Sequence, residues 1–244
     1  MAERRQRILN AARSLVAERG YEALTMRELA QASRVTVPTL YNLIGGKQAV
    51  LAAAIEEQTA RFVRRIEGRA EQSPAGRLLA VIEACTHELL GLPAYYRSLL
   101  QLLYRAEAAS QLRGRVDRAL GGELAGALSA IAKAGELVPW ADPRALLRSL
   151  RSQLGANALQ WAAGDLSDGA FPATCSYDAC LTLLGVTTGR SREQLARAAR
   201  AAQAAPERAA RRAKPGAQRA SPSKGRASRP PAGAQRAARA KEEV

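Results

Sequence analysis

Hydrophobic residues recur every three or four positions along most of the chain, which is the spacing of amphipathic helices. They make up 47% of the 244 residues, much of this as alanine, while aromatic residues make up 4%. This pattern predicts an all-α protein rather than a β-sandwich. The expected helices span residues 4–19, 47–70, 75–91, 94–106, 109–134, 143–163 and 171–188, with two short helices between 25 and 44 and a short basic helix, capped by Ser191, that ends near 205.

Capping residues mark the two short helices. Thr25 and Glu28 have the spacing of a capping box, in which a hydroxyl and a carboxylate satisfy free backbone N–H groups at a helix start. That helix should end near residues 33–34. Thr36 can cap the second helix, and Pro38 is tolerated in its first turn because backbone donors there have no partner within the helix. Two short helices joined by about three residues are typical of a helix-turn-helix DNA reader.

The second short helix should have one face for the core and another for a partner. Leu40 and Ile44 lie four residues apart and should face inward. Asn can read adenine and Thr or Val can touch a thymine methyl group, whereas Tyr41 and Lys47 are placed to contact phosphate. The alternative is a core tyrosine and a solvated lysine. The residues expected to face outward are Thr36, Val37, Thr39, Tyr41 and Asn42.

A set of residues near the amino terminus forms a recognisable pattern: Arg7-Ile8-Leu9, Ala11-Ala12, Gly20-Tyr21, Thr25, Leu29-Ala30, Val35-Thr36, Thr39-Leu40-Tyr41 and Lys47. Over residues 4–52 this pattern resembles the amino-terminal domain of TetR-family transcriptional regulators. The resemblance implies a homodimer that binds a pseudo-palindromic operator in double-stranded DNA. The DNA-binding residues that it implies are Thr25, Arg27, Thr36, Val37, Pro38, Thr39, Tyr41, Asn42 and Lys47.

The sequence departs from the family pattern at three positions of the reader. Arg34 stands where the family usually has glycine in the turn, and an arginine is strained if that position is left-handed. Leu43 and Ile44 stand where the family usually has His-Phe. Leu43 thereby removes a polar group that often touches phosphate in the family.

The resemblance also implies that the later helices enclose an effector cavity. We expect a DNA-binding domain at 1–50, an effector-binding and dimerisation domain at 51–205 and a disordered basic tail at 206–244. The helices at 143–163 and 171–188 are the expected dimer surface, although their apolar stripes alone also fit an intramolecular core. The candidate ligand-binding residues, for which core or dimer packing is the alternative, are His87, Tyr95, Tyr96, Tyr104, Gln153, Asn157 and Trp161.

Charge is concentrated at the carboxyl terminus. Residues 206–244 hold eleven Lys and Arg against three Glu, which is +8 of the formal net charge of +15. This stretch has almost no large apolar side chain and is expected to add sequence-independent attraction to DNA. A solubilising extension that binds nothing is the alternative.

Residue types that carry other chemistries are sparse. The three cysteines, Cys85, Cys175 and Cys180, have no CxxC spacing, and packing as reduced thiols is expected over a redox role for Cys175 and Cys180. A single histidine, His87, without clustered partners predicts no metal site, and we expect no cofactor. No nucleophile motif or phosphate-binding glycine loop is present, so we do not expect an enzyme. No apolar run is long enough to span a bilayer, so we expect no membrane partner. No apolar signal core follows the first residues, so we expect a cytoplasmic protein.

Three functions fit these observations. The first is a DNA-binding transcriptional regulator, more specifically a repressor that a small hydrophobic effector releases from its operator. The second is a nucleoid-type protein whose basic tail dominates a non-specific binding to DNA. The third is an interaction protein on the same fold that has lost its reader function.

Overall fold

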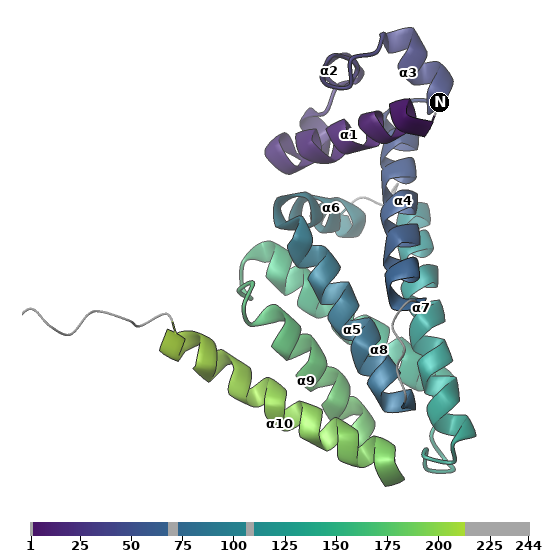
Figure 1. The fold of residues 1–244 in the computed structure, drawn as a ribbon, viewed down its shortest axis with the longest axis vertical. Helices are drawn as coiled ribbons and strands as arrows, with labels where there is room; N and C mark the ends of the chain where they lie inside the picture. The colour runs from purple at the N-terminus through teal and green to yellow at the C-terminus, as the bar shows by residue number, and fades with distance from the viewer. Residues whose placement is uncertain (1, 68–72, 106–109, 213–244) are drawn as a thin grey trace, which may run out of the picture.

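A computed structural model describes residues 2–67, 73–105 and 110–212 (Figure 1). Its secondary structure is helical, and the described residues contain no strand beyond an isolated bridge between Leu137 and Thr187. The all-α prediction is therefore confirmed. The helices are α1 (Ala2–Ala23), α2 (Met26–Ala32), α3 (Val37–Leu43), α4 (Lys47–Glu67), α5 (Pro74–Gly91), α6 (Pro93–Arg105), α7 (Ser110–Lys133), α8 (Pro143–Ala163), α9 (Phe171–Leu184) and α10 (Gly189–Arg212).

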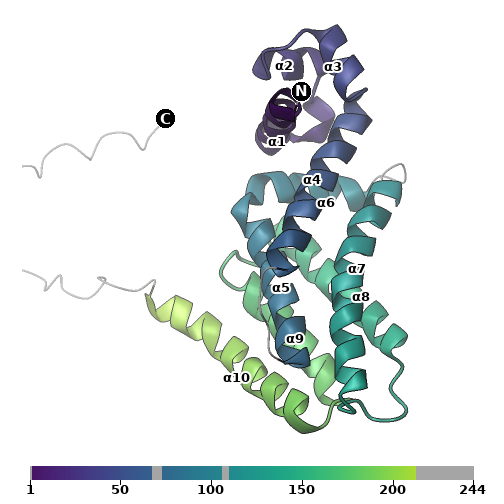
Figure 2. The ribbon, with the colours of Figure 1, turned by 45° about the vertical axis from the view of Figure 1, so that its right-hand side comes forward.

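Helix α4 connects two layers of the molecule (Figures 1 and 2). Helices α1, α2 and α3 form a small unit at one end, and α4 leaves this unit to pack against α5 and α7 in the larger one. Helix α6 lies below α1, across the long axis of the molecule, and contacts α1, α7 and α8. The hydrophobic core runs continuously through both units, from Ile8 in α1 to Ala199 in α10. Movement in the larger unit can therefore reach α1 through both α4 and α6.

Four of the predicted signals at helix ends are confirmed. Thr25 and Glu28 form the predicted capping box, with the Thr25 hydroxyl accepting from the Glu28 N–H at 3.2 Å and Glu28 accepting from the Thr25 N–H at 3.3 Å. Thr36 caps α3. Asp142 caps α8 by accepting from two backbone N–H groups at 2.9 and 3.1 Å. Gly20 leaves the helical conformation with a φ of 80°, as expected for a residue that ends a helix.

The turn between α2 and α3 is a Schellman motif with arginine at its left-handed position. Arg34 has a φ of 54°, so the strain predicted for a non-glycine residue falls on it. Its N–H donates to the Gln31 carbonyl at 3.1 Å, and the Val35 N–H donates to the Ala30 carbonyl at 3.0 Å. Arg7 of α1 donates to the Ser33 carbonyl at 2.9 Å and so fixes the turn against the first helix.

The prediction for the last helix was wrong at both of its ends. Helix α10 begins at Gly189, and Ser191 donates rather than caps: its N–H and its hydroxyl bond the Glu136 carboxylate at 3.1 and 2.5 Å. Helix α10 then continues to Arg212, seven residues past the expected end at 205. Residues 213–244 of the predicted tail lie outside the described residues.

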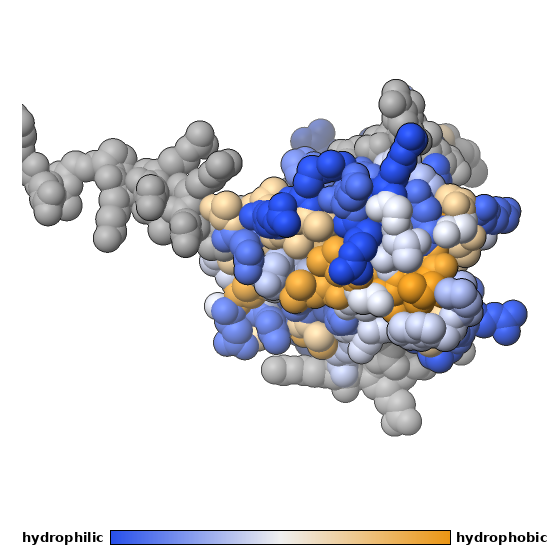
Figure 3. All heavy atoms as spheres, turned by 90° about the horizontal axis from the view of Figure 1, so that it is seen from below, coloured by the Kyte–Doolittle hydropathy of each residue, from blue (hydrophilic) through white to orange (hydrophobic). Residues whose placement is uncertain are grey.

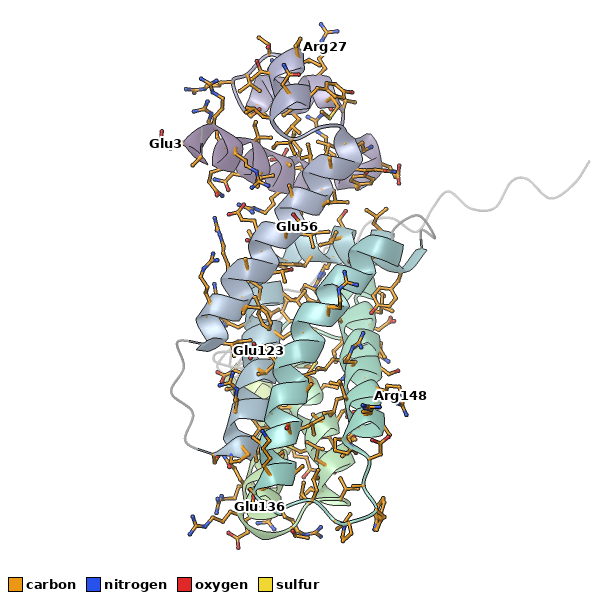
Figure 4. All side chains as sticks on the ribbon, turned by 90° about the vertical axis from the view of Figure 1, so that its right-hand side faces the viewer. Glu3, Arg27, Glu56, Glu123, Glu136 and Arg148 are labelled. Carbon is orange, nitrogen blue, oxygen red and sulfur yellow. The ribbon has the colours of Figure 1, made fainter. Side chains whose placement is uncertain are left out.

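The hydrogen bonds between Glu136 and Ser191 of α10 lie at the end of the molecule opposite the reader, where Figure 4 shows Glu136. The backbone there is paired as well, since the Thr188 N–H donates to the Glu136 carbonyl and the Val138 N–H to the Val186 carbonyl, both at 2.9 Å. Viewed from this end, hydrophobic residues form a strip between hydrophilic side chains (Figure 3). The segment after α7 and the segment before α10 therefore close this end of the core together.

Candidate DNA-binding surface and effector cavity

Helix α3 lies at one end of the molecule (Figure 1), and its side chains differ in exposure. Leu40 is fully buried in the core, whereas the next residue, Tyr41, is 51% exposed. The hydroxyl of Thr36 accepts from the Thr39 N–H at 3.3 Å and lies 2.8 Å from the Thr39 hydroxyl. Of the DNA-binding candidates on α3 and its cap, Thr36, Pro38, Tyr41 and Asn42 are exposed, and Val37 and Thr39 are half-buried.

Helix α2 adds two candidates beside α3. Arg27 is exposed and projects from the tip of the molecule (Figure 4). Thr25 is exposed, but its hydroxyl both donates to Glu28 at 2.8 Å and accepts from the Glu28 N–H. The Thr25 hydroxyl is the main cause that holds the pKa of Glu28 below its usual value, with the Arg19 guanidinium at 2.9 Å adding to it. The capping box therefore stays charged and closed at neutral pH.

Lys47 lies at the first residue of α4, but its ammonium group is already engaged. Its Nζ donates to the Glu22 carbonyl at 2.9 Å and lies 4.5 Å from the centre of the Tyr21 ring. These contacts tie α4 to the end of α1, so Lys47 supports packing as well as supplying positive charge. A phosphate at this helix start would meet that charge and the free N–H groups of the first turn.

A cavity of about 160 Å³ lies in the larger unit, between α4, α5, α6, α7, α8 and α9. Three of the predicted ligand-binding residues, Tyr95, Tyr96 and Tyr104, line it. Tyr95 is 1% exposed, and burial raises its pKa to about 12. Most of the wall is apolar and includes Ile55, Phe62, Leu99, Leu103, Leu154 and Phe171.

One part of the cavity wall is polar and hydrogen-bonded. Gln58 donates through its amide nitrogen to Glu88 and to the Tyr96 hydroxyl, both at 3.3 Å. Tyr96 in turn donates to the same Glu88 oxygen at 3.0 Å, and Arg65 pairs with the other oxygen at 2.8 Å. Burial is the main reason that the pKa of Tyr96 is raised, with Glu88 raising it further, so the phenol keeps its proton. We call Gln58, Glu88 and Tyr96 the polar cluster.

The polar cluster is connected to α1 of the reader through Arg13. This arginine is 8% exposed, and its guanidinium donates to Gln58 at 3.5 Å and to Glu57 at 3.3 Å. Its other terminal nitrogen, Nη2, donates to the side-chain oxygen of Asn10, also on α1. A side chain of the first helix therefore contacts a residue of the cavity wall directly.

The other predicted ligand-binding residues lie outside the cavity wall. His87 is exposed on α5. Gln153 and Asn157 join α8 to α9 by bonds to Thr182 at 2.7 Å and to Asp178 at 2.9 Å. Trp161 is fully buried, stacks on Phe171 at 5.1 Å between ring centres and donates to Asp168 at 2.7 Å. The structure thus places these four residues on the surface, between helices or in the core.

Two residues of the cavity wall, Gln58 and Glu88, and the arginine bonded to Gln58, Arg13, were not foreseen from the sequence. A signal for two of them was present. Gln58 lies on the same helical stripe as Ile55 and Phe62, and Arg13 lies beside the apolar positions of α1. A polar residue on a buried stripe must find a hydrogen-bond partner. A polar residue at a buried position of an otherwise apolar helical stripe is therefore the sequence signal for the polar cluster.

The cysteines pack as expected within the described residues. Cys85 and Cys175 line the cavity, and burial raises the pKa of each thiol to about 12. Cys180 is fully buried, and its pKa is raised to about 11 for the same reason. None of the three forms a disulfide. In the described chain, no three His, Cys, Asp or Glu side chains gather as metal ligands would, and no helix is long and apolar enough to cross a membrane.

The small unit with its exposed α3 and the helical unit with its apolar cavity define a class of protein. Helix-turn-helix regulators with a separate helical domain have this architecture. Residues 8–54 match the family described as "Bacterial regulatory proteins, tetR family". Residues 8–54 therefore form an amino-terminal domain of the kind found in the TetR family of transcriptional regulators.

A curated relative agrees with this assignment. The chain is 29% identical over 108 residues to the "HTH-type transcriptional repressor KstR" of Rhodococcus jostii. The matched segment covers 44% of this chain and 51% of that protein, so the match spans about half of the relative's length.

Solved structures show the same fold over most of the described chain. A TetR transcription regulator from Haloarcula marismortui has a TM-score of 0.68 at 18% identity and covers 77% of this chain and 100% of its own. The regulator FadR from Bacillus subtilis, solved in complex with stearoyl-CoA, has a TM-score of 0.66 at 20% identity, covering 74% and 98%. SmeT, the repressor of a multidrug efflux pump of Stenotrophomonas maltophilia, has a TM-score of 0.63 at 21% identity, covering 77% and 92%.

Proposed function

We propose that this protein is a homodimeric repressor that binds an operator through α3 and leaves it when a small, mainly apolar effector fills the cavity. One observation carries the proposal: α4 belongs to both units. Its first residue, Lys47, is bonded to the end of α1, and its later residues Gln58 and Phe62 form part of the cavity wall. The known proteins support the proposal, because the relative KstR and the structural neighbour SmeT are repressors and FadR was solved with an acyl-CoA.

The DNA-bound form follows from the geometry of the reader. A dimer would place its two α3 helices in successive major grooves about 34–36 Å apart. Tyr41 and Lys47 would hold the phosphate backbone, while Asn42 and the threonines of α3 would reach base edges. An effector that favours another separation of the readers would weaken DNA binding. By linkage, DNA would weaken effector binding by the same factor.

The route from cavity to reader follows the contacts already described. A molecule beside the polar cluster would meet Gln58, which bonds Arg13 of α1. Displacement of Gln58 would leave the buried guanidinium of Arg13 short of a partner, which costs free energy in a buried site. The existing bond from Arg13 to Glu57 of α4 would remain. We therefore expect α1 to shift relative to α4 rather than to detach.

Selection of bound sites from random duplex DNA with the purified full-length protein tests the function. We expect a two-fold symmetric consensus with half-sites about one helical turn apart. Asn42→Ala should change the preferred base at one or more positions, whereas Gln31→Ala, an exposed substitution on α2, should leave the consensus unchanged. Recovery of no consensus, with strong salt-dependent binding to all duplexes, would favour the nucleoid-type alternative, and no binding at all would favour the interaction protein.

A further inference from the structure

The hydroxyl of Tyr95 is buried and has no hydrogen-bond partner among the described residues. Tyr95 lines the cavity and is 1% exposed. Burial raises its pKa to about 12, so the phenol keeps its proton at neutral pH and remains a hydrogen-bond donor. A buried donor that bonds nothing costs free energy, because it has lost its hydrogen bonds to water. An acceptor brought in by a ligand would recover that loss.

The neighbouring tyrosine is a hydroxyl of the same wall that does have partners. Tyr96 is 8% exposed, and its ring packs edge-on against that of Tyr95, with 5.1 Å between the ring centres. Its hydroxyl donates to Glu88 at 3.0 Å and lies 3.3 Å from the amide nitrogen of Gln58. The two tyrosines therefore differ in hydrogen bonding rather than in burial, and of the two, Tyr95 has the proton that a ligand can use.

The position of Tyr95 on α6 places it at one end of an apolar face. Tyr95, Leu99 and Leu103 are spaced four residues apart and so lie on one side of the helix. All three line the cavity. A ligand that is bonded to the Tyr95 hydroxyl can therefore place its apolar part against Leu99 and Leu103.

The charges around Tyr95 favour a neutral acceptor. Arg13 and Glu57 affect its hydroxyl in opposite directions, and they are bonded to each other at 3.3 Å. Arg61 pairs with the other oxygen of Glu57. A carboxylate beside Tyr95 would find Arg13 already paired, and an uncompensated charge in a mostly apolar cavity is costly. A ketone or ester carbonyl accepts the hydrogen bond without that cost.

Resting on the proposed effector site, we propose that the cavity binds a neutral carbonyl compound, a ketone or an ester, whose oxygen accepts a hydrogen bond from Tyr95 and whose apolar part lies against Leu99 and Leu103. The cavity of about 160 Å³ is close in size to one of about 150 Å³ in another protein that holds benzene. One six-membered ring with a short carbonyl substituent therefore fits the enclosed part.

Three probes of similar size separate the possible ligand chemistries. Acetophenone has a neutral carbonyl group, cumene has a methyl group in place of the carbonyl oxygen, and benzoate is an anionic acceptor. Dissociation constants are measured for the full-length protein by ligand-detected NMR titration, and benzoate should bind more weakly than acetophenone. Acetophenone labelled with ¹³C at its carbonyl reports the hydrogen bond directly, because the carbonyl resonance moves downfield when the oxygen accepts one.

The variant Tyr95→Phe removes the hydroxyl and keeps the ring. It should weaken acetophenone binding about fivefold, the factor that one hydrogen bond of ordinary strength contributes, and leave cumene binding no weaker. The downfield shift of the bound carbonyl should be lost. The midpoint of thermal unfolding should stay the same or rise, since no hydrogen bond within the protein is lost, whereas Tyr96→Phe should lower it.

The matched control is Tyr177→Phe. Tyr177 lies outside the cavity wall, and its hydroxyl accepts a hydrogen bond from Gln203 at 3.0 Å. Its replacement removes a tyrosine hydroxyl elsewhere in the larger unit and should leave the affinities for acetophenone and cumene unchanged.

Every other outcome would overturn the inference. These are an equal loss of affinity for acetophenone and cumene in Tyr95→Phe, no loss for either, or no binding of any probe. Tighter binding of benzoate than of acetophenone would place the acceptor at Arg151, a cation that also lines the cavity. Unfolding of Tyr95→Phe would show that its hydroxyl has a structural partner.

Operator binding is measured on the same samples in the absence of probes. Its loss would reject the proposed function but leave the probe affinities as they are, so the two failures are distinguishable.

Discussion

Arg34 is a residue type that is unfavourable for the backbone motif in which it lies. It occupies the left-handed position of the Schellman motif after α2, where glycine is the usual residue. In this conformation the Cβ atom of an L-residue lies too close to the following carbonyl oxygen. The two backbone hydrogen bonds of the motif and the bond from Arg7 to Ser33 keep the turn in place nevertheless. Stability is therefore being lost at a site beside the DNA reader.

Replacing Arg34 by glycine should recover that stability. We expect Arg34→Gly to raise the free energy of unfolding by about 1 kcal/mol, since it removes the crowded Cβ atom. Urea unfolding followed by circular dichroism measures the change. Arg34→Ala is the matched control, because it removes the same charge but keeps Cβ, and it should give no comparable gain. Equal changes in the two variants would mean that the side chain, not the backbone conformation, determines the effect.

Tyr41 offers a second test at the scale of one group. Its side chain is 51% exposed beside the buried Leu40, so its hydroxyl is available to a phosphate. Tyr41→Phe should weaken binding to operator and random duplexes by a similar factor, about fivefold for one hydrogen bond of about 1 kcal/mol. Tyr104→Phe, which alters a tyrosine of similar exposure, 42%, in the larger unit, should leave DNA affinity unchanged. Loss on the operator alone would show that Tyr41 contacts a base.

At the scale of helices, a cap made by residues close in the sequence could be predicted, whereas a cap made by a residue far away in the sequence could not. The capping box of Thr25 and the Asp142-Pro143 start depend on residues within three positions, so their patterns are visible along the chain. The cap of α10 comes from Glu136, 55 residues before Ser191, and no local pattern contains it. The cavity shows the same division, since its aromatic residues were anticipated but the partners of Gln58 come from three different helices.

The pairing of Glu136 with Ser191 should make the docking of α10 dependent on pH. The Ser191 hydroxyl is the main cause that lowers the pKa of Glu136 below its usual 4.5 in the folded protein. A lowered pKa in the folded state means that this stabilisation is complete above pH 4.5 and is lost as the pH falls through the lowered value. We expect Glu136→Gln to cost about 1 kcal/mol at pH 7, in the range of a lost helix cap, and to cost little near pH 3.

Urea unfolding at both pH values measures the difference for Glu136→Gln. Glu193→Gln is the control, because Glu193 is exposed on the same helix and forms no hydrogen bond or ion pair with the described residues. An equal cost for Glu136→Gln at pH 3 and pH 7 would show that the carboxylate charge does not contribute.

At the scale of the whole molecule, the proposed dimer should depend on the free face of α9. Helix α9 packs against α8, α5 and α10, yet Leu181 remains 50% exposed. Leu181 lies on one of the two helices proposed for a four-helix interface. Because it is an exposed leucine, we expect it to lie near the centre of that interface. Leu181→Asp should convert the dimer to a monomer in sedimentation velocity at micromolar concentration. Trp140→Ser, at a residue that is 75% exposed after α7, should leave the dimer intact.

The carboxyl terminus allows a prediction from charge alone. Helix α10 extends to Arg212, so a truncation there keeps the helix and removes eight Lys and Arg with two Glu. Cations near DNA displace condensed counterions whatever the base sequence. The truncated protein should bind operator and random duplexes more weakly, with a flatter dependence of affinity on salt and an unchanged ranking of operators. Identical salt slopes before and after truncation would show that this segment takes no part in binding.

The hydrogen bonds between Glu136 and Ser191 of α10 also affect the order in which the helices can pack while the chain is synthesised. A ribosome adds about 5 to 20 residues per second, so the 55 residues between Glu136 and Ser191 take roughly 3 to 11 seconds. Because α5 and α7 precede α10, their packing can be complete before the last helix leaves the ribosome. Helix α10 is therefore the last described helix to be synthesised, and its capping carboxylate has already been made when it emerges.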